Sequence, residues 1–342
     1  MREKLPPSEA LIVSCLHNAY GLEVTTLTLL PLGADLNASV YKAQTKNETP
    51  YFIKLKCGHQ HEMSIAILEL LHAAGIQQII LPIKTLHGQS TQLIEGHTLI
   101  VYPFIEGENG FNHTLTGQQW MTLGKTLRQV HEIDVPVSLQ KQVRKEGYSS
   151  KWREAVRLFY SQIEAEPAGD EFALQFVKVM KEKKALICHL VERAEELGQK
   201  LQNQASQFVL CHSDIHGGNV LIDKDGALYI VDWDEPIMAP KERDLMFIGG
   251  GVANVWNKPH EEKLFYEGYG KCDVQAALLS YYRCERIVED IAHFIPELLL
   301  ATAKSKNRQE TYKHFVDMFE SQGVVDRALN STLYNFDERD FP

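Results

Sequence analysis

The segment that decides the fold is residues 211–234, CHSDIHGGNVLIDKDGALYIVDWD. Asp214 and Asn219 lie five positions apart in a predicted loop. Asp232 follows a predicted hairpin, because the Asp-Lys-Asp-Gly run at 223–226 joins two short apolar strands. The hairpin returns the chain to its start, so the three side chains can converge. A carboxylate, an amide and a second carboxylate at this spacing are typical of a metal–nucleotide site.

Phosphoryl transfer depends mainly on positioning the attacking group and on neutralising phosphate charge through Mg²⁺. Mg²⁺ prefers oxygen ligands and takes only one or two from protein carboxylates. Asp232 and the amide oxygen of Asn219 meet this need, which leaves Asp214 to accept a hydrogen bond from a hydroxyl. The alternative is that these residues only form turns and caps. The hairpin, however, does not require His212 and Asp214 upstream of it.

The first hundred residues are predicted to form short strands with one or two helices. The expected helix and strands are 8–20, 25–32, 39–44 and 51–56. In the last of these strands, alternation puts Lys54 and Lys56 on one face and Ile53 and Leu55 on the other. Lys54 then needs an acidic partner. Glu62 and Glu69 lie one heptad apart on a helix predicted from about 62 to 74, and Glu62 is favoured. Exposure of both lysines on an edge strand is the alternative.

An apolar strand is predicted at 99–105, LIVYPFI, before the glycine-containing run EGENG. This pattern suits a hinge between two lobes. Because Pro103 lacks an N–H, the main-chain groups of Tyr102, Phe104 and Ile105 are predicted to contact the edge of adenine. These side chains would also suit a plain core. Further helices are predicted at 118–133, 152–163, 172–201, 263–270 and 276–294.

The 342-residue length predicts two lobes, each with its own core. We expect a nucleotide-binding lobe at 1–102, a hinge at 103–110 and a catalytic and substrate-binding lobe at 111–342. No apolar stretch approaches the length of a membrane span, and the start of the chain lacks a signal region, which predicts a cytoplasmic protein. Six cysteines without metal-type spacing are interpreted as thiols in a reducing compartment.

The formal net charge of -10 argues against general affinity for nucleic acid or an anionic membrane. It is compatible with a cationic small-molecule substrate. The sequence indicates no obligate protein partner.

The lysine strand, hinge, catalytic loop and metal aspartate occur in the order found in aminoglycoside phosphotransferases, and the chain resembles that family over nearly its whole length. The resemblance implies an α+β, two-lobed protein-kinase-like fold, with a small antiparallel-sheet N-lobe and a larger, mainly helical C-lobe. The runs YFIKLK (51–56), VLCHSDIH (209–216) and PKERDLMFIGGG (240–251) resemble the branch that acts on spectinomycin. Ser213 is a departure, because many members have glycine there.

Carried over residue by residue, the resemblance implies that Asp214 is the catalytic base or orients the hydroxyl. It also implies Asn219 and Asp232 as Mg²⁺ ligands and Lys54 as a contact to the phosphates of ATP. The implied activity is O-phosphorylation of an aminocyclitol antibiotic, most simply spectinomycin, with ATP and Mg²⁺ as cofactors and resistance as the outcome.

An aminocyclitol carries ammonium groups and hydroxyls, so its site needs carboxylates and perhaps an aromatic face. The candidate substrate contacts are Asp234, Glu235, Trp256, Tyr266, Glu285 and Glu289. Glu285 and Glu289 are also at i, i+4 spacing beside Arg283 and Arg286, and the alternative is that they form only surface or interhelix ion pairs.

Two other functions stay open. A metabolic kinase of the same fold would act on a choline-, sugar- or amino-sugar-type substrate, and only a substrate panel separates it from an antibiotic kinase. A pseudokinase that binds ATP without turnover would be favoured by loss of Lys54, Asp214, Asn219 or Asp232. All four residues are present.

Overall fold

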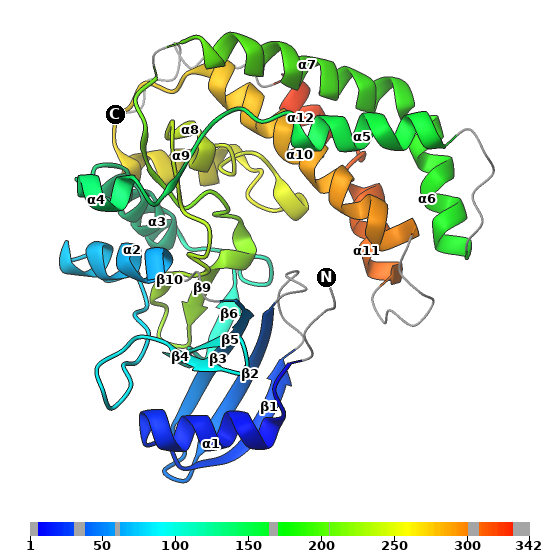
Figure 1. Cartoon of the computed structure of the whole chain (residues 1–342). Coiled ribbons are helices and arrows are strands. Elements are labelled where there is room, and N and C mark those ends of the chain that lie inside the picture. Colours follow the sequence, from blue (N-terminus) through cyan, green and yellow to red (C-terminus); the bar gives the residue numbers. More distant parts are fainter. Residues whose placement is uncertain are drawn as a thin grey trace. The chain divides into compact units, whose positions relative to one another are not determined.

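The computed structural model describes residues 6–30, 38–58, 62–163, 170–204, 206–299 and 308–330 (Figure 1). Contacts between residues divide the chain into two compact units. The N-terminal unit comprises Met1–His113, Ile133–Val143 and Asn219–Pro236, and the helical unit comprises Thr114–Glu132, Arg144–Gly218 and Ile237–Pro342. The hairpin that follows the predicted catalytic loop therefore belongs to the N-terminal unit.

The N-terminal unit contains a five-stranded antiparallel sheet in the order β1-β2-β3-β5-β4. Its strands are β1 Val24–Leu30, β2 Ala38–Thr45, β3 Pro50–Cys57, β4 Gln92–Ile94 and β5 His97–Pro103. Ile53 and Leu55 of β3 are buried in the core on one face of this sheet. The register pairs Lys54 with Val40 on β2 and Ile100 on β5, so β3 is an interior strand. The predicted alternation along β3 is confirmed, whereas an edge strand is excluded.

Helix α1 (Glu9–Tyr20) lies across this sheet (Figure 1). The Ser8 side chain caps its N-terminus by accepting from the Leu11 N–H, and Gly21 ends it with φ of 68°. Ile12 and Leu16, four residues apart, are fully buried in the same core as Ile53 and Leu55. The remaining helices of this unit are α2 Glu62–Ala73 and α4 Val137–Gln140.

A second sheet of the N-terminal unit has the order β10-β9-β6. Its strands are β6 Gly107–Asn109, β9 Val220–Asp223 and β10 Leu228–Ile230. The predicted turn between β9 and β10 is confirmed, because the Asp223 carboxylate accepts from the N–H groups of Asp225 and Ala227 at 2.9 and 2.8 Å. Gly226 completes the turn with φ of 86°. A parallel bridge between Ile79 and Ile230 ties the hairpin to the chain after α2.

The helical unit contains most of the helices. Its elements are α3 Gly117–His131, β7 Arg144–Lys145, α5 Lys151–Gln162, α6 Glu171–Glu182, α7 Lys184–Gln202, β8 Val209–Cys211, β11 Ile237–Ala239, α8 Glu242–Leu245, α9 Pro259–Tyr269, α10 Ala276–Leu299, α11 Arg308–Asp317 and α12 Val324–Asn330. The three strands form a small sheet in the order β7-β11-β8, which holds the start of the catalytic loop.

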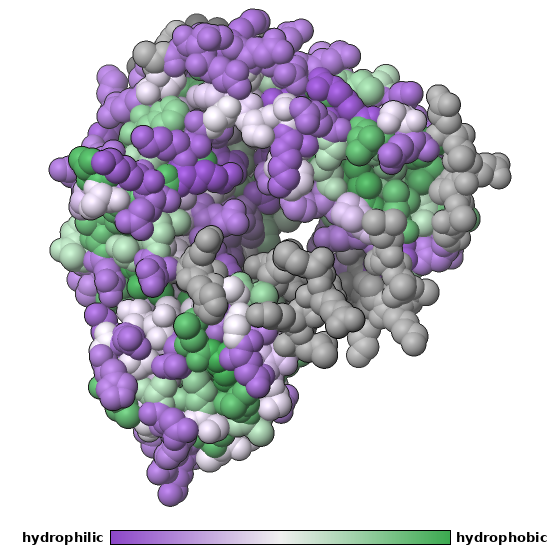
Figure 2. Space-filling model, in the orientation of Figure 1, coloured by the Kyte–Doolittle hydropathy of each residue, from purple (hydrophilic) through white to green (hydrophobic). Residues whose placement is uncertain are grey.

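The prediction of a single helix at 172–201 is wrong. Two helices, α6 and α7, cover this range, and Lys183 interrupts the helical conformation between them. Lys183 has φ of -92° and ψ of 5°, outside the helical range. Met180 and Ile187 lie on either side and are both fully buried in the same core. The apolar stripe therefore continues across the break and conceals it. Figure 2 shows hydrophilic side chains over the outer face of α7.

Helices α3 and α9 approach each other closely because each supplies a glycine. A Cβ atom on Gly124 would lie 2.1 Å from the Phe265 carbonyl oxygen, and one on Gly268 would lie 2.0 Å from that of Met121. No larger residue fits at either position. This approach places His131 of α3 beside Tyr269 of α9, with His131 Nδ1 2.7 Å from the Tyr269 hydroxyl.

All six cysteines are unpaired, and Cys57 is exposed. Among the helices of the described residues, none is long and apolar enough to cross a membrane.

Candidate active site

Lys54 lies at the centre of an ion-pair cluster within the N-terminal unit. Its Nζ is 2.8 Å from Asp232 Oδ1 and 2.7 Å from Asp234 Oδ2. Lys56 Nζ is 2.6 Å from the same oxygen of Asp234. Burial alone would lower the pKa of Lys54, but the two aspartates outweigh it and raise that pKa. Lys54 therefore stays charged at neutral pH, as a phosphate contact requires.

Asp234 is held ionised by the same lysines. Burial acts to raise the pKa of Asp234, and the charges of Lys54 and Lys56 hold it well below the usual range. The predicted partner of Lys54, Glu62, is exposed at the first residue of α2. In this structure the two aspartates satisfy Lys54, so a pairing with Glu62 stays a prediction. The structure thus brings together Lys54, Asp232 and Asp234, which come from β3 and from the chain after β10.

The β9–β10 hairpin places the two predicted metal ligands at the same end. Ile230 pairs with Val220, and the next N–H, that of Val231, donates to the Asn219 carbonyl oxygen at 2.9 Å. Asn219 therefore lies opposite the residue that precedes Asp232. Trp233, 4% exposed, anchors the chain here by donating from Nε1 to the Ile230 carbonyl oxygen at 3.0 Å.

This donor set fits a magnesium ion. Asp232 contributes a carboxylate that is 48% exposed, and Asn219 contributes an amide oxygen from the adjacent turn. Both are hard oxygen ligands, and two protein ligands leave room for phosphate oxygens and water. Lys54 Nζ donates to Oδ1 of Asp232 at 2.8 Å, and the carboxylate has a second oxygen that would suit a metal.

In the helical unit, Asp244 of α8 holds the catalytic loop. Its carboxylate accepts from the main-chain N–H groups of His212 at 2.9 Å and Ser213 at 2.7 Å. His131 Nε2 lies 3.0 Å from Asp244 Oδ2. Asp244 is fully buried, and although burial acts to raise its pKa, these contacts, His131 first among them, lower it. No local spacing points to Asp244, so its role could not be predicted from the sequence.

The same region brings a histidine, a cysteine and an aspartate close enough to suggest a metal site, namely His131, Cys211 and Asp244. Both ring nitrogens of His131 already have partners, Tyr269 and Asp244. Burial raises the pKa of the Cys211 thiol well above its usual value, so a thiolate is disfavoured. We interpret the cluster as a structural hydrogen-bond network.

Ser213 has φ of 75°, in the left-handed region that favours glycine. This explains in physical terms why glycine suits the position. In this chain the charge-assisted bond from the Ser213 N–H to Asp244 helps to hold the strained residue.

Asp214 contacts two nitrogen groups within the helical unit. Arg286 Nη1 of α10 is 2.5 Å from its Oδ1, and His216 Nε2 is 3.3 Å from its Oδ2. Burial acts to raise the pKa of Asp214, but Arg286 and His216 outweigh burial and hold that pKa far below the ordinary aspartate value. The carboxylate is therefore ionised throughout the physiological range. From the sequence, Arg286 was expected only as a surface or interhelix partner of Glu285 and Glu289.

The strand predicted at 99–105 ends earlier than expected, because β5 is His97–Pro103 and Phe104 and Ile105 lie beyond it. Tyr102 belongs to β5, and the Phe104 N–H donates to the Pro50 carbonyl oxygen at a long 3.4 Å. The Lys42 Nζ lies 4.3 Å from the centre of the Phe104 ring. Ile105 is half-buried. Contact of these residues with adenine stays a prediction.

The aromatic substrate candidates are buried within the helical unit. Trp256 and Tyr266 are each 6% exposed, and Trp256 packs edge-on against Trp120 at 5.2 Å between ring centres. Trp256 Nε1 has no hydrogen-bond partner, and the residue has φ of 55°. Of the acidic candidates, Glu235 is exposed and Glu289 is half-buried. Their contact with substrate stays a prediction.

Glu285, the remaining candidate, forms an ion pair with Arg153 of α5. Its other oxygen, Oε1, is buried without a partner. Burial outweighs the charge of Arg153 and raises the pKa of Glu285 to about 7. The folded-state pKa thus lies above that of an unfolded glutamate, about 4.3. The contribution of this carboxyl to stability is fully present below the unfolded pKa and is lost as pH rises through about 7.

We therefore expect Glu285→Gln to become more stable relative to the unmodified protein as pH rises from 5 to 8, by roughly 2 to 3 kcal/mol. Thermal unfolding at several pH values measures this. Glu195→Gln is the matched control, because Glu195 binds the same Arg153 but has a lowered pKa. Its stability difference should stay flat over this range. A flat difference for Glu285→Gln would contradict the prediction.

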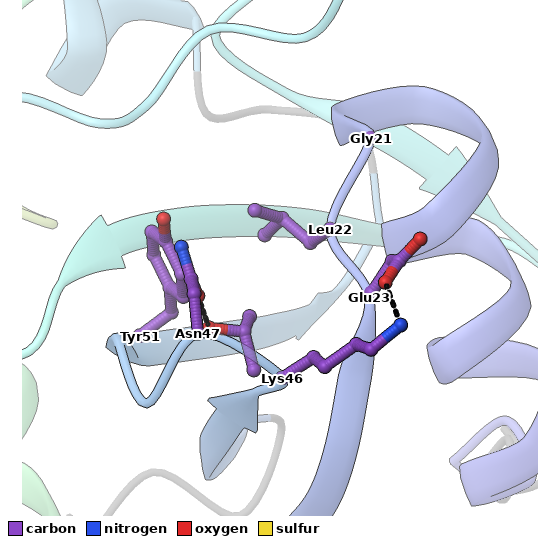
Figure 3. A pocket seen from close by; sticks show the side chains of 7 residues that line it. Gly21, Leu22, Glu23, Lys46, Asn47 and Tyr51 are labelled. Atoms are coloured by element: carbon purple, nitrogen blue, oxygen red, sulfur yellow. Dashed lines mark hydrogen bonds and ion pairs between the residues drawn. The ribbon is translucent and has the colours of Figure 1, made fainter.

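A separate pocket of about 300 Å³ lies in the N-terminal unit (Figure 3). It is lined by Gly21, Leu22, Glu23, Thr45, Lys46, Asn47 and Tyr51. Its polar side chains bind one another, with Lys46 Nζ 3.5 Å from Glu23 and the Thr45 hydroxyl bonded to Asn47. None of the predicted site residues lines it.

The model of the phosphotransferase enzyme family, APH, matches residues 28–265, and the chain belongs to this family. It is a phosphotransferase that acts on a hydroxyl group, with the kinase-like aminoglycoside phosphotransferase fold that the resemblance implied. No curated protein sequence matches the chain.

Among solved structures, the chain is similar to spectinomycin phosphotransferase APH(9)-Ia in complex with ADP and spectinomycin. The two share 48% identity over 96% of this chain and 99% of that one, with a TM-score of 0.90. The AMP-bound complex of the same enzyme is 47% identical over 95% and 99% of the two chains, with a TM-score of 0.86. A choline kinase from Streptococcus pneumoniae, 17% identical over 95% and 98%, has a TM-score of 0.51 and shows the fold alone.

Proposed function

We propose that this chain catalyses ATP- and Mg²⁺-dependent O-phosphorylation of spectinomycin, which inactivates the antibiotic and confers resistance. The observation that carries the proposal is the 48% identity, over 96% of the chain, to the phosphotransferase whose structure contains ADP and spectinomycin. ATP as the phosphoryl donor is consistent with action in the cytoplasm. The alternative of a pseudokinase is disfavoured, since Lys54 is charged and Asp214 is ionised.

In this proposal, 1–102 is the nucleotide lobe, 103–110 the hinge and 111–342 the catalytic and substrate lobe. Lys54 contacts the phosphates, while Asn219 and Asp232 hold Mg²⁺, which neutralises phosphate charge when bound. Asp214 orients the attacking hydroxyl. The candidate contacts to the ammonium groups are Asp234, Glu235, Trp256, Tyr266, Glu285 and Glu289.

The test is Mg²⁺-dependent ADP release from ATP in the presence of spectinomycin, with choline, a kanamycin-type aminoglycoside and no acceptor as comparisons. We expect stimulation by spectinomycin alone and a product heavier by one phosphoryl group in the mass spectrum. Stimulation by choline instead would favour a metabolic kinase. No stimulation by any acceptor, with ATP still bound, would reject the proposed substrate while leaving the family assignment intact.

A further inference from the structure

Arg286 and His216 occupy both oxygens of the Asp214 carboxylate. Arg286 Nη1 donates to Oδ1 at 2.5 Å. The Gly218 N–H donates to His216 Nδ1 at 3.0 Å, so the ring proton is on Nε2, which lies 3.3 Å from Asp214 Oδ2. A carboxylate has about four lone pairs, so the same group can accept from Arg286, from His216 and from a substrate hydroxyl.

Arg286 is itself held rigidly. Its Nε donates to Asp290 Oδ1 at 2.9 Å, one turn later on α10. Its guanidinium lies over the Phe247 ring at 5.4 Å from the ring centre, and its side chain is 19% exposed. The planar fork of arginine fixes two carboxylates at once, which a lysine cannot do. The charged groups that face it are Asp214, Asp290 and Glu289.

We propose that Arg286 is a positioning residue for phosphoryl transfer, which holds the Asp214 carboxylate in the orientation that aligns the attacking hydroxyl. The inference rests on the proposed role of Asp214, and it names Arg286 as the residue that holds Asp214 in place for this role. A strongly stabilised carboxylate is a weak proton acceptor, so Asp214 acts by orienting the hydroxyl rather than by removing its proton beforehand. Asp290 acts one step further away, as the anchor of Arg286.

Replacing Arg286 with glutamine tests the inference. Loss of the fixed orientation should lower kcat about 10²-fold, since a misplacement of 1 Å has this effect, while KM for ATP stays nearly constant. Arg286→Lys should recover part of kcat, because it restores the charge without the fork. Arg157→Gln is the control, because it removes a half-exposed arginine of the same unit that binds Glu195 at 3.2 Å. The control should leave kcat unchanged.

A double-mutant cycle separates positioning from a general structural role. If Arg286 acts through Asp214, Arg286→Gln should cause no further loss of the residual turnover of Asp214→Ala. The ratio of Arg286→Gln to unmodified kcat should also fall, to about half, as pH decreases from 6 to 4, because without Arg286 the Asp214 carboxylate titrates nearer the ordinary value of about 3.9. Protonation of the nucleotide affects kcat of both enzymes equally, so it does not change this ratio.

Three results would overturn the inference. The first is a kcat of Arg286→Gln within a factor of about two of that of the unmodified enzyme, because misplacement of Asp214 should lower kcat far more than this. Another is equal loss in the Gln and Lys variants with a lowered Tm and a pH-independent ratio. The third is a full additional loss in the Asp214→Ala background. The acceptor is whichever compound of the panel the unmodified enzyme phosphorylates, so failure of spectinomycin as substrate is a separate outcome.

Discussion

Asp214→Ala is expected to lower kcat by about 10²- to 10⁴-fold, the usual contribution of a group that serves the attacking nucleophile. Binding of ATP should persist, because Lys54 and its two aspartates belong to the N-terminal unit and do not involve Asp214. Steady-state kinetics gives kcat, and calorimetry gives the ATP affinity. Asp273→Ala, at an exposed aspartate of the helical unit, is the control and should retain full activity.

Two outcomes for Asp214→Ala would contradict the assigned role. Turnover close to that of the control would show that another group orients the hydroxyl. Loss of ATP binding together with turnover would indicate that Asp214 maintains the fold. Removal of Asp214 leaves Arg286 with Asp290 as its partner, so we expect the variant to fold.

Asp232→Asn should have an effect of similar size. Replacing the proposed metal carboxylate with an amide should lower kcat about 10³-fold, which corresponds to about 4 kcal/mol of lost transition-state stabilisation. Lys54 keeps Asp234 as a partner at 2.7 Å, so the N-terminal unit should remain folded. The measurement is nucleotide affinity with and without Mg²⁺, and we expect the gain from Mg²⁺ to shrink.

The matched control is Asp225→Asn, on the exposed turn of the same hairpin. It should leave kcat and the Mg²⁺ dependence unchanged. If Asp232→Asn behaves like this control, Asp232 is not a metal ligand, and its role is limited to the ion pair with Lys54.

Local sequence patterns predicted the elements that interactions between neighbouring residues determine. The Asp-Lys-Asp-Gly turn encodes the β9–β10 hairpin, since Asp223 and Gly226 satisfy the turn by themselves. Alternation along β3 placed Ile53 in the core because side chains of a strand alternate between faces. The break at Lys183 escaped prediction because α6 and α7 bury one continuous apolar stripe.

Partners distant in sequence could not be read from spacing. Spacing favoured Glu62, on the following helix, as the partner of Lys54, and it could not indicate Asp232, which is 178 residues away. Asp244 and Arg286 contact the catalytic loop through α8 and α10, which follow it along the chain. Only tertiary packing brings these residues to the loop, so a motif search identifies Asp214 without the groups that orient it.

The left-handed conformation of Ser213 has a consequence for transplanting this chemistry to other scaffolds. A strained non-glycine residue costs about 1 to 3 kcal/mol, and an isolated peptide with the sequence of the loop would relax from it. The shape is imposed by the Asp244 carboxylate, which accepts from both His212 and Ser213. A scaffold that is to reproduce the loop conformation therefore needs residues from separate parts of the chain. These are the loop itself, Asp244, and His131, which binds the Asp244 carboxylate.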